Sequence, residues 1–208
     1  MISYKIHLIR TGATGEGPRK CYVGQADIPL SESGRHALEQ LREEFSYPPA
    51  EALYTSPLSR CRETAGILYP GSHPVVVDDL KDMNLGAFEG KTFDELREEE
   101  TFVRWLDDSF KNTPPGGEGT DAFTLRTLTA LNSILRQMME KKITSAAVIT
   151  HGGVIMALMA ATAIPRLPFH KWAAGNGCGY TLMTNTQMWM RDRCAEVFSF
   201  LPDGECTI

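Results

Sequence analysis

Short apolar runs alternate with helical patterns along nearly the whole 208-residue chain. Apolar and β-branched residues predict strands near 6–8, 51–55, 75–77, 146–150, 180–184 and 196–200. Apolar residues spaced by three and four predict helices at about 31–45, 56–69, 92–111, 120–142 and 154–163. This alternation predicts a three-layer α/β/α sandwich with a mostly parallel central sheet.

Local sequence signals predict where two helices begin and where the chain is interrupted before the longest helix. Ser31 is a predicted N-cap, and Ser56-Pro57 supplies an N-cap followed by a proline, whose φ suits the first helical turn. The run 75–77 is expected to be a buried strand, and the prolines and glycines at 114–117 break the chain before the longest helix. Composition does not shift along the sequence, so a single domain over 1–208 is predicted.

The overall composition narrows the possible partners. A hydrophobic fraction of 42% with 23% charged residues is typical of a globular protein, and a net charge of -5 disfavours nucleic acid and anionic membranes as partners. No apolar run approaches the roughly 18 residues of a membrane span, which favours a cytoplasmic protein. Five cysteines without a C-x-x-C pair are interpreted as reduced thiols: Cys21, Cys61, Cys178, Cys194 and Cys206.

Three predicted strands end in residues suited to a phosphate group. Ligands of open α/β sheets bind beyond the carboxyl ends of the strands, where arginine forks and backbone N–H groups can hold a dianion. Singly, each residue has an ordinary structural explanation, but together, with Asp82 and Glu89 nearby, they predict a phosphate site. The three strand ends carry Arg10-Thr11-Gly12, Arg60 and His151-Gly152-Gly153.

Six ordered motifs resemble the histidine phosphatase superfamily, which has the phosphoglycerate mutase-like fold. Together they cover nearly the full chain, and the small phosphatases that include α-ribazole phosphatase are the most similar branch. The motifs are "LIRTGAT" at 8–14, "YVGQADIPLSESG" at 22–34, "TSPLSRCRETA" at 55–65, "LKDMNLGAFEG" at 80–90, "PPGGEG" at 114–119 and "ITHGG" at 149–153.

The resemblance implies a role for each matching residue. Arg10, Arg60 and His151 would hold the transferring phosphoryl group, and Asp82 would protonate the leaving oxygen in place of the more usual glutamate. No metal or cofactor is implied. Segment 92–118 would be a small helical cap over the pocket, and the remaining substrate-binding positions would be Gly12, Gly24, Glu118, which braces the pocket loop, and Gly152.

Thr11 stands where the family pattern has its nucleophilic histidine. A neutral imidazole nitrogen attacks phosphorus directly, whereas a hydroxyl needs a base to take its proton. His151 could be that base or a back-up nucleophile, although the resemblance assigns it to gripping the phosphate. Phosphohistidine turnover is therefore expected to be lost or severely slowed.

Three functions remain open. The first is a phosphatase acting on a small phosphorylated metabolite, and the alternative is a pseudophosphatase that binds a phosphate ligand without turnover. A phosphoglycerate mutase is less favoured, because 208 residues leave little room for long insertions over the pocket. The expected partners are a phosphorylated metabolite or inorganic phosphate, with the chain a monomer or homodimer.

Three further residues have open interpretations. Trp105 and Phe110 precede the proline and glycine break, and they either line the substrate mouth or form the core of the cap. Arg19, after the first glycine turn, is a candidate for a second contact with an anionic substrate.

Overall fold

The computed structural model describes residues 2–15, 21–109 and 111–203. Within them a seven-stranded sheet has the order β3-β2-β4-β1-β6-β7-β5. β6 runs antiparallel to β1 and β7, and the other strand pairs are parallel. The strands are β1 (Ser3–Arg10), β2 (Ala52–Thr55), β3 (Val75–Val76), β4 (Ser145–Thr150), β5 (Ala163–Ile164), β6 (Gly179–Asn185) and β7 (Ala195–Leu201).

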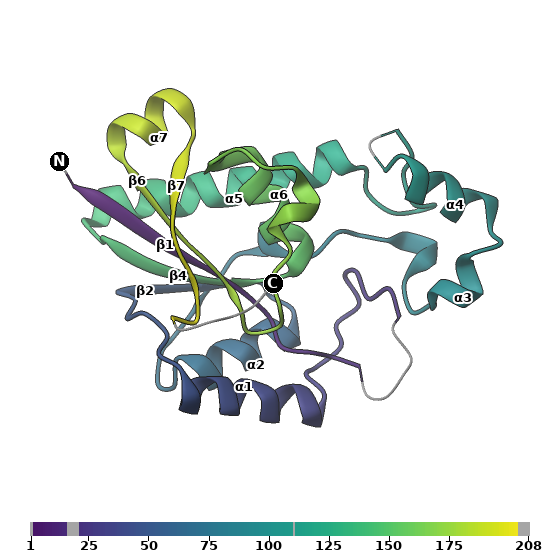
Figure 1. Cartoon of the computed structure of the whole chain (residues 1–208), viewed down its shortest axis with the longest axis horizontal. Coiled ribbons are helices and arrows are strands. Elements are labelled where there is room, and N and C mark those ends of the chain that lie inside the picture. Colours follow the sequence, from purple (N-terminus) through teal and green to yellow (C-terminus); the bar gives the residue numbers. More distant parts are fainter. Residues whose placement is uncertain (1, 16–20, 110, 204–208) are drawn as a thin grey trace.

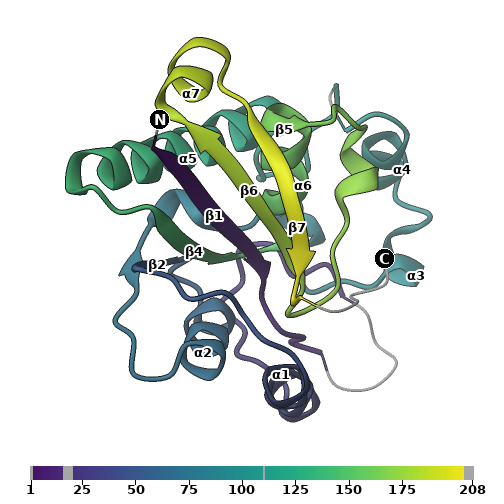
Figure 2. The ribbon, with the colours of Figure 1, turned by 60° about the vertical axis from the view of Figure 1, so that its left-hand side comes forward.

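Helices cover both faces of this sheet (Figure 1). α1 (Glu32–Glu44) and α2 (Ser59–Leu68) lie on one face, and α5 (Thr120–Lys141) and α6 (Gly152–Thr162) lie on the other. α7 (Thr186–Asp192) connects β6 to β7, which lie beside β1 in Figure 2. The predicted α/β/α sandwich with a mostly parallel sheet is therefore confirmed.

β1 is apolar on both faces because it is buried on both. Ile6 and Leu8 pack into the core cluster under α5 and α6, whereas Ile9 packs into the cluster under α1 and α2. All three side chains are fully buried, as expected from the alternation of side chains across a strand. This packing fixes where β1 ends and therefore where Arg10 and Thr11 emerge.

One of the two predicted helix starts is confirmed and the other is wrong. Ser31 caps α1, with its hydroxyl accepting from the backbone N–H of Gly34. α2, however, begins at Ser59 after the N-cap Leu58, not at Ser56-Pro57. Ser56 is fully buried, and its hydroxyl lies 2.9 Å from a ring nitrogen of His151, so the side chain expected to cap a helix is used by the site instead.

The expected burial of the run at 75–77 is also wrong. β3 pairs only with β2 at the edge of the sheet, and Val75 and Val76 are 50% and 54% exposed. An apolar run does not report whether its strand is central or at an edge. β5 and α7 were not predicted, because one is two residues long and the other is a short helix capped by Asn185.

The expectation that all five cysteines are reduced is wrong. Cys21, Cys61 and Cys194 are free, but Cys178 is disulfide-bonded. An odd count without a C-x-x-C pair does not exclude a disulfide, because sequence spacing does not report which Cα atoms come close. Cys206 lies outside the described residues.

The segment between β3 and α5 contains short helices packed around aromatic side chains. 3-10 turns at Asp78–Leu80 and Gly86–Phe88 lead into α3 (Phe93–Leu96) and α4 (Glu100–Asp107). Outside this segment, a further 3-10 turn spans Phe169–Trp172, between β5 and β6. α3 and α4 lie at the side of the molecule toward which the parallel strands run (Figure 1). No described helix combines the length and the apolar character that crossing a bilayer requires.

Candidate active site

The carboxyl ends of β1, β2 and β4 meet at one cavity of about 540 Å³. The register pairs Arg10 of β1 with Thr150 of β4, and Thr55 of β2 with Ile149, so the residues that follow these strands converge. The described lining is Arg10, Thr11, Gly12, Ala13, Thr14, Gly15, Cys21, Val23, Ile28, Arg60, Asp82, His151, Gly152 and Asn176. Seven of the nine predicted site residues therefore share one pocket.

Arg10 is held in place by the loop before β6. Its Nη1 donates to the carbonyl of Ala174 over 2.6 Å. A Cβ on Gly152 would lie 3.1 Å from its Nε, so this position leaves room for the guanidinium by having no side chain. Burial lowers the pKa of Arg10 from its ordinary value, with Asp82 opposing that shift, and a guanidinium remains charged in a protein.

Arg60 is 3% exposed, and protein groups engage all three of its nitrogens. Nη1 donates to the carbonyl of Ala26 over 2.8 Å, and Nη2 donates to the carbonyl of Gly24 over 2.7 Å. Nε donates to Nδ1 of His151 over 3.2 Å. Each terminal nitrogen carries two hydrogens, so one on each can still serve an anion in the cavity.

His151 is a buried, neutral imidazole. Because Nδ1 accepts from Arg60, the ring proton is assigned to Nε2, which donates to the Ser56 hydroxyl over 2.9 Å. Burial lowers its pKa well below the ordinary value, and the charges of Arg60, Arg126 and Arg10 lower it further. Cys61 lies 3.5 Å from Nε2 through its sulfur. Burial raises the pKa of that thiol to about 12, so it is protonated.

Asp82 has the properties of a proton donor. Burial of its carboxyl raises its pKa to about 6, although the Met83 backbone N–H and the nearby arginines act in the opposite direction. Oδ1 accepts from Met83 over 3.0 Å, and Oδ2 lies 3.9 Å from Nδ1 of His151. A Cβ on Gly153 would lie 2.9 Å from Oδ1, so a glycine there lets the carboxyl approach the first turn of α6.

The Thr11 hydroxyl is directed toward another hydroxyl. Thr64 donates to the carbonyl of Arg60 over 2.7 Å and accepts from the backbone N–H of Gly12. The Thr11 hydroxyl lies 3.2 Å from that Thr64 oxygen and 3.4 Å from the carbonyl of Gly12, and it can donate its proton to either. Both acceptors are weak bases, so neither activates the hydroxyl for attack.

Two predicted residues, Gly24 and Glu118, lie outside the described pocket lining. Gly24 has φ +55 and presents its carbonyl to Arg60, so it shapes the pocket through the backbone. Glu118 accepts from the backbone N–H of Asn84 and forms a 2.6 Å ion pair with Arg126. Arg126 also donates to the carbonyl of Asp82, so this pair braces the loop that carries the carboxyl.

Asn176 lines the pocket and was missed by the sequence reasoning. Its Nδ2 donates to the carbonyl of Thr11 over 2.7 Å. Asn176 does not follow a strand. Because β6 runs antiparallel to β1, the residues before β6 reach the same edge of the sheet as the residues after β1. A polar residue between Gly175 and Gly177, just ahead of this strand, was the available signal.

The aromatic residues of segment 92–118 form a small core. Trp105 packs against Tyr22, Phe88 and Phe102, with ring centroids 6.2, 5.7 and 6.0 Å away. No residue of this segment is among the described pocket lining, which favours the cap-core interpretation of Trp105 over the substrate-mouth one. Phe110 and Arg19 lie outside the described residues.

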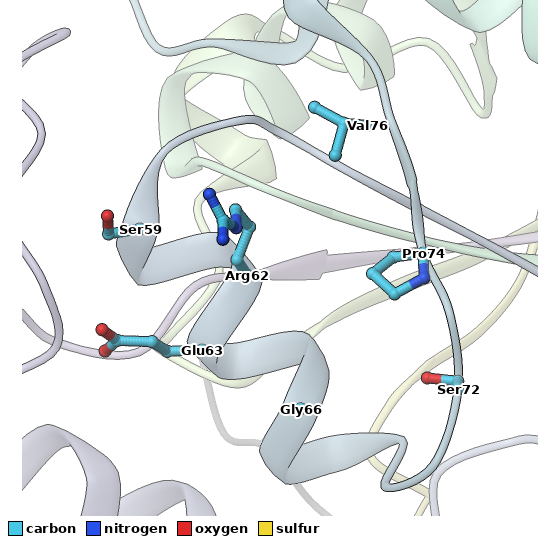
Figure 3. Close-up of a pocket in the computed structure, with 7 residues that line it drawn as sticks. All are labelled: Ser59, Arg62, Glu63, Gly66, Ser72, Pro74 and Val76. Carbon is cyan, nitrogen blue, oxygen red and sulfur yellow. The ribbon is translucent and has the colours of Figure 1, made fainter.

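A second hollow lies between α2 and the segment leading into β3 (Figure 3). Ser59, Arg62, Glu63 and Gly66 come from the helix, and Ser72, Pro74 and Val76 come from the opposite segment. It shares no residue with the cavity at the strand ends. Across the described parts of the chain, no three His, Cys, Asp or Glu side chains are grouped to hold a metal ion.

The chain belongs to the histidine phosphatase superfamily (branch 1), whose family model matches residues 6–195. It is 26% identical over 183 residues to an adenosylcobalamin/alpha-ribazole phosphatase of Salmonella typhi, covering 86% of this chain and 89% of that protein.

Two solved structures extend the comparison. The alpha-ribazole phosphatase from Shigella flexneri has a TM-score of 0.72 at 23% identity, covering 88% of this chain and 92% of that one. A phosphoglycerate mutase from Thermus thermophilus has a TM-score of 0.65 at 26% identity, covering 95% of this chain and 98% of that one. The fold is therefore shared with a phosphatase and with a mutase.

Proposed function

We propose that this protein binds small phosphomonoesters in the cavity at the strand ends and acts as a phosphatase whose phosphohistidine turnover is lost or severely slowed. The observation that carries the proposal is one cavity lined by Arg10, Arg60 and His151. The same cavity holds Asp82, whose pKa is raised, and Thr11, which stands where the family pattern has its nucleophile. Membership of the histidine phosphatase superfamily supports the reaction class.

In this proposal each side chain has a separate task. Arg10 and Arg60 bind the phosphoryl oxygens, because guanidinium forks hold a dianion in a fixed orientation. Asp82, protonated below about pH 6, gives its proton to the leaving oxygen as a nucleophile bonds to phosphorus and the P–O bond breaks. The attacking imidazole is missing, and the Thr11 hydroxyl faces Thr64.

The same Thr11 contact favours a second candidate function. A pseudophosphatase would keep the arginine cradle for phosphate binding and would have no turnover. A phosphoglycerate mutase remains a third and weaker candidate, since that reaction also needs a group that carries the phosphoryl between two positions.

We also propose a single domain over 1–208 with segment 92–118 as its cap, located in the cytoplasm as a monomer or homodimer. The uniform composition and the position of α3 and α4 support the domain proposal.

The affinity for phosphate tests the site directly. Phosphate binding is measured by calorimetry in excess EDTA for the protein and for Arg10→Ala. Loss of one charged hydrogen-bonding partner should weaken binding by roughly tenfold or more. Arg60 is less suitable for this test, because it also holds the carbonyls of Gly24 and Ala26.

Arg62→Ala is the matched control. This arginine lines the separate hollow of Figure 3, so its removal should leave the affinity unchanged. Equal binding by Arg10→Ala and the unaltered protein would place the phosphate site elsewhere.

A further inference from the structure

Three side chains of the cavity lining come from one loop. They are Cys21, Val23 and Ile28, called here the apolar wall. Ile28 is 37% exposed, and Val23 is half-buried. Exposed apolar side chains at the edge of a charged cavity are unfavourable in water unless a ligand covers them.

The loop that carries the apolar wall is anchored on both sides. Arg60 holds the carbonyls of Gly24 and Ala26, and Glu89 accepts from the backbone N–H of Gln25 over 2.8 Å. The loop is thereby tied to the phosphate end of the cavity. A wall fixed before the ligand arrives loses little conformational entropy on binding.

Tyr22, the residue between Cys21 and Val23 in the sequence, packs into a different part of the structure. Its backbone N–H donates to the carbonyl of Lys91, and its ring packs on Phe102 at a centroid distance of 5.3 Å. Tyr22 therefore belongs to the aromatic core under α4, whereas Cys21 and Val23 line the cavity. The apolar wall is a built feature of the cavity and not an unpacked edge of that core.

Positive charge in the described lining is confined to the phosphate end. Arg10 and Arg60 are its cationic residues, His151 is neutral, and Asp82 is acidic. A substrate with a second anionic group, such as a carboxylate, would find no further cation among these residues. It would instead meet Asp82 or the apolar wall.

We infer that the apolar wall is a leaving-group subsite, and that the cavity takes phosphomonoesters of aryl or otherwise apolar alcohols. The inference rests on the proposed function, because the same arginines must hold the phosphoryl group.

Three non-hydrolysable phosphonates test the inference by binding alone, so no turnover is needed. Methylphosphonate reports the phosphate site, benzylphosphonate adds an apolar group, and phosphonoacetate adds a carboxylate. We expect benzylphosphonate to bind at least about tenfold more tightly than methylphosphonate, because covering an aromatic ring and the apolar wall removes apolar surface from water. Phosphonoacetate, whose added group is charged, should bind less tightly than benzylphosphonate.

Substitutions in the apolar wall localise the effect. Val23→Ser and Ile28→Ser should each reduce the benzyl-to-methyl affinity ratio at least about threefold and leave methylphosphonate binding unchanged, which also shows that the variants fold. Val76→Ser, an exposed valine of the separate hollow in Figure 3, is the matched control and should keep the ratio.

The outcomes distinguish the two proposals. Equal affinity for methyl- and benzylphosphonate, or tighter binding of phosphonoacetate than of benzylphosphonate, would overturn the subsite and leave the phosphate site standing. A ratio that survives both substitutions in the apolar wall would also overturn it. If none of the three phosphonates binds, the proposed function itself fails.

Discussion

Nε of Arg60 donates to Nδ1 of His151 across 3.2 Å, and this contact sets the tautomer of His151. It assigns the ring proton to Nε2, which donates to the buried Ser56 hydroxyl. Both ring nitrogens are therefore engaged, and burial with nearby arginines lowers the pKa of His151 further. His151 thus orients Arg60 within the cavity, and its basic nitrogen is not directed at Thr11.

Replacing Thr11 with histidine should create turnover. The hydroxyl is tied to Thr64, whereas an imidazole at this position would attack phosphorus without needing a base. We expect Thr11→His to raise kcat by several orders of magnitude on a generic phosphomonoester, since losing a nucleophile in another hydrolase costs about a million-fold. Phosphate affinity should stay within about tenfold, because the arginines bind the ground state.

Thr11→Ala is the control for this variant. If the hydroxyl has no part in attack, the alanine variant and the unaltered protein should hydrolyse substrate at the same slow rate. Turnover of the unaltered protein at the rate of Thr11→His would mean that Thr11, His151 or a water attacks already. Acid-labile phosphoprotein should accumulate only in the histidine variant.

Asp82 should control the dependence on the leaving group. Its pKa of about 6 means that the proton is available below that pH and is lost as the pH rises through it. In the Thr11→His background, hydrolysis of alkyl phosphates should fall above about pH 6, whereas aryl phosphates need little acid assistance. Asp82→Asn should slow alkyl phosphates by roughly 10²–10⁴ and remove this part of the pH profile. An equal effect on both substrate types would reject the assignment.

The same carboxyl should destabilise the fold at high pH. The ordinary pKa of an aspartate is 3.8, whereas that of Asp82 in the folded protein is about 6, so the unfolded chain ionises first. Stability therefore falls between about pH 4 and pH 6 and stays lower above that range. Asp82→Asn should raise the free energy of unfolding by roughly 1–3 kcal/mol at about pH 8, with no gain at about pH 3.5. Urea titrations at the two pH values measure this, and an equal change at both would contradict it.

Gly153 should be essential for placing Asp82. A Cβ there would lie 2.9 Å from Oδ1 and would push the carboxyl from its position. In the Thr11→His background, Gly153→Ala should lower kcat for alkyl phosphates by about tenfold or more and aryl phosphates less. Gly66→Ala in α2 is the matched control, since nothing lies within 4 Å of its added Cβ. It should leave kcat unchanged and stabilise the protein by up to about 1 kcal/mol.

The sequence predicted most helices and strands, but it did not predict where α2 begins or that β3 is exposed. Ser56-Pro57 has the pattern of a helix start, yet Ser56 is buried and its hydroxyl accepts a hydrogen bond from His151. The valines at 75 and 76 have the pattern of a buried strand, yet they lie at the sheet edge. In both cases the local sequence pattern is present, but the tertiary structure decides the outcome. Intrinsic propensity carries no information about which residues surround a segment in the folded protein.

The sequence by itself determined the α/β sandwich, because strand and helix periodicity is a local signal. It also indicated seven residues of the cavity, through the residues that follow the strands and the six motifs that resemble the family. Only the tertiary structure decided that Asn176 belongs to the cavity, since antiparallel β6 brings its preceding loop to the same edge. It also decided the chemistry of Asp82 and His151. Their pKa values depend on burial and on charges from distant segments, and these exist only once the chain has folded.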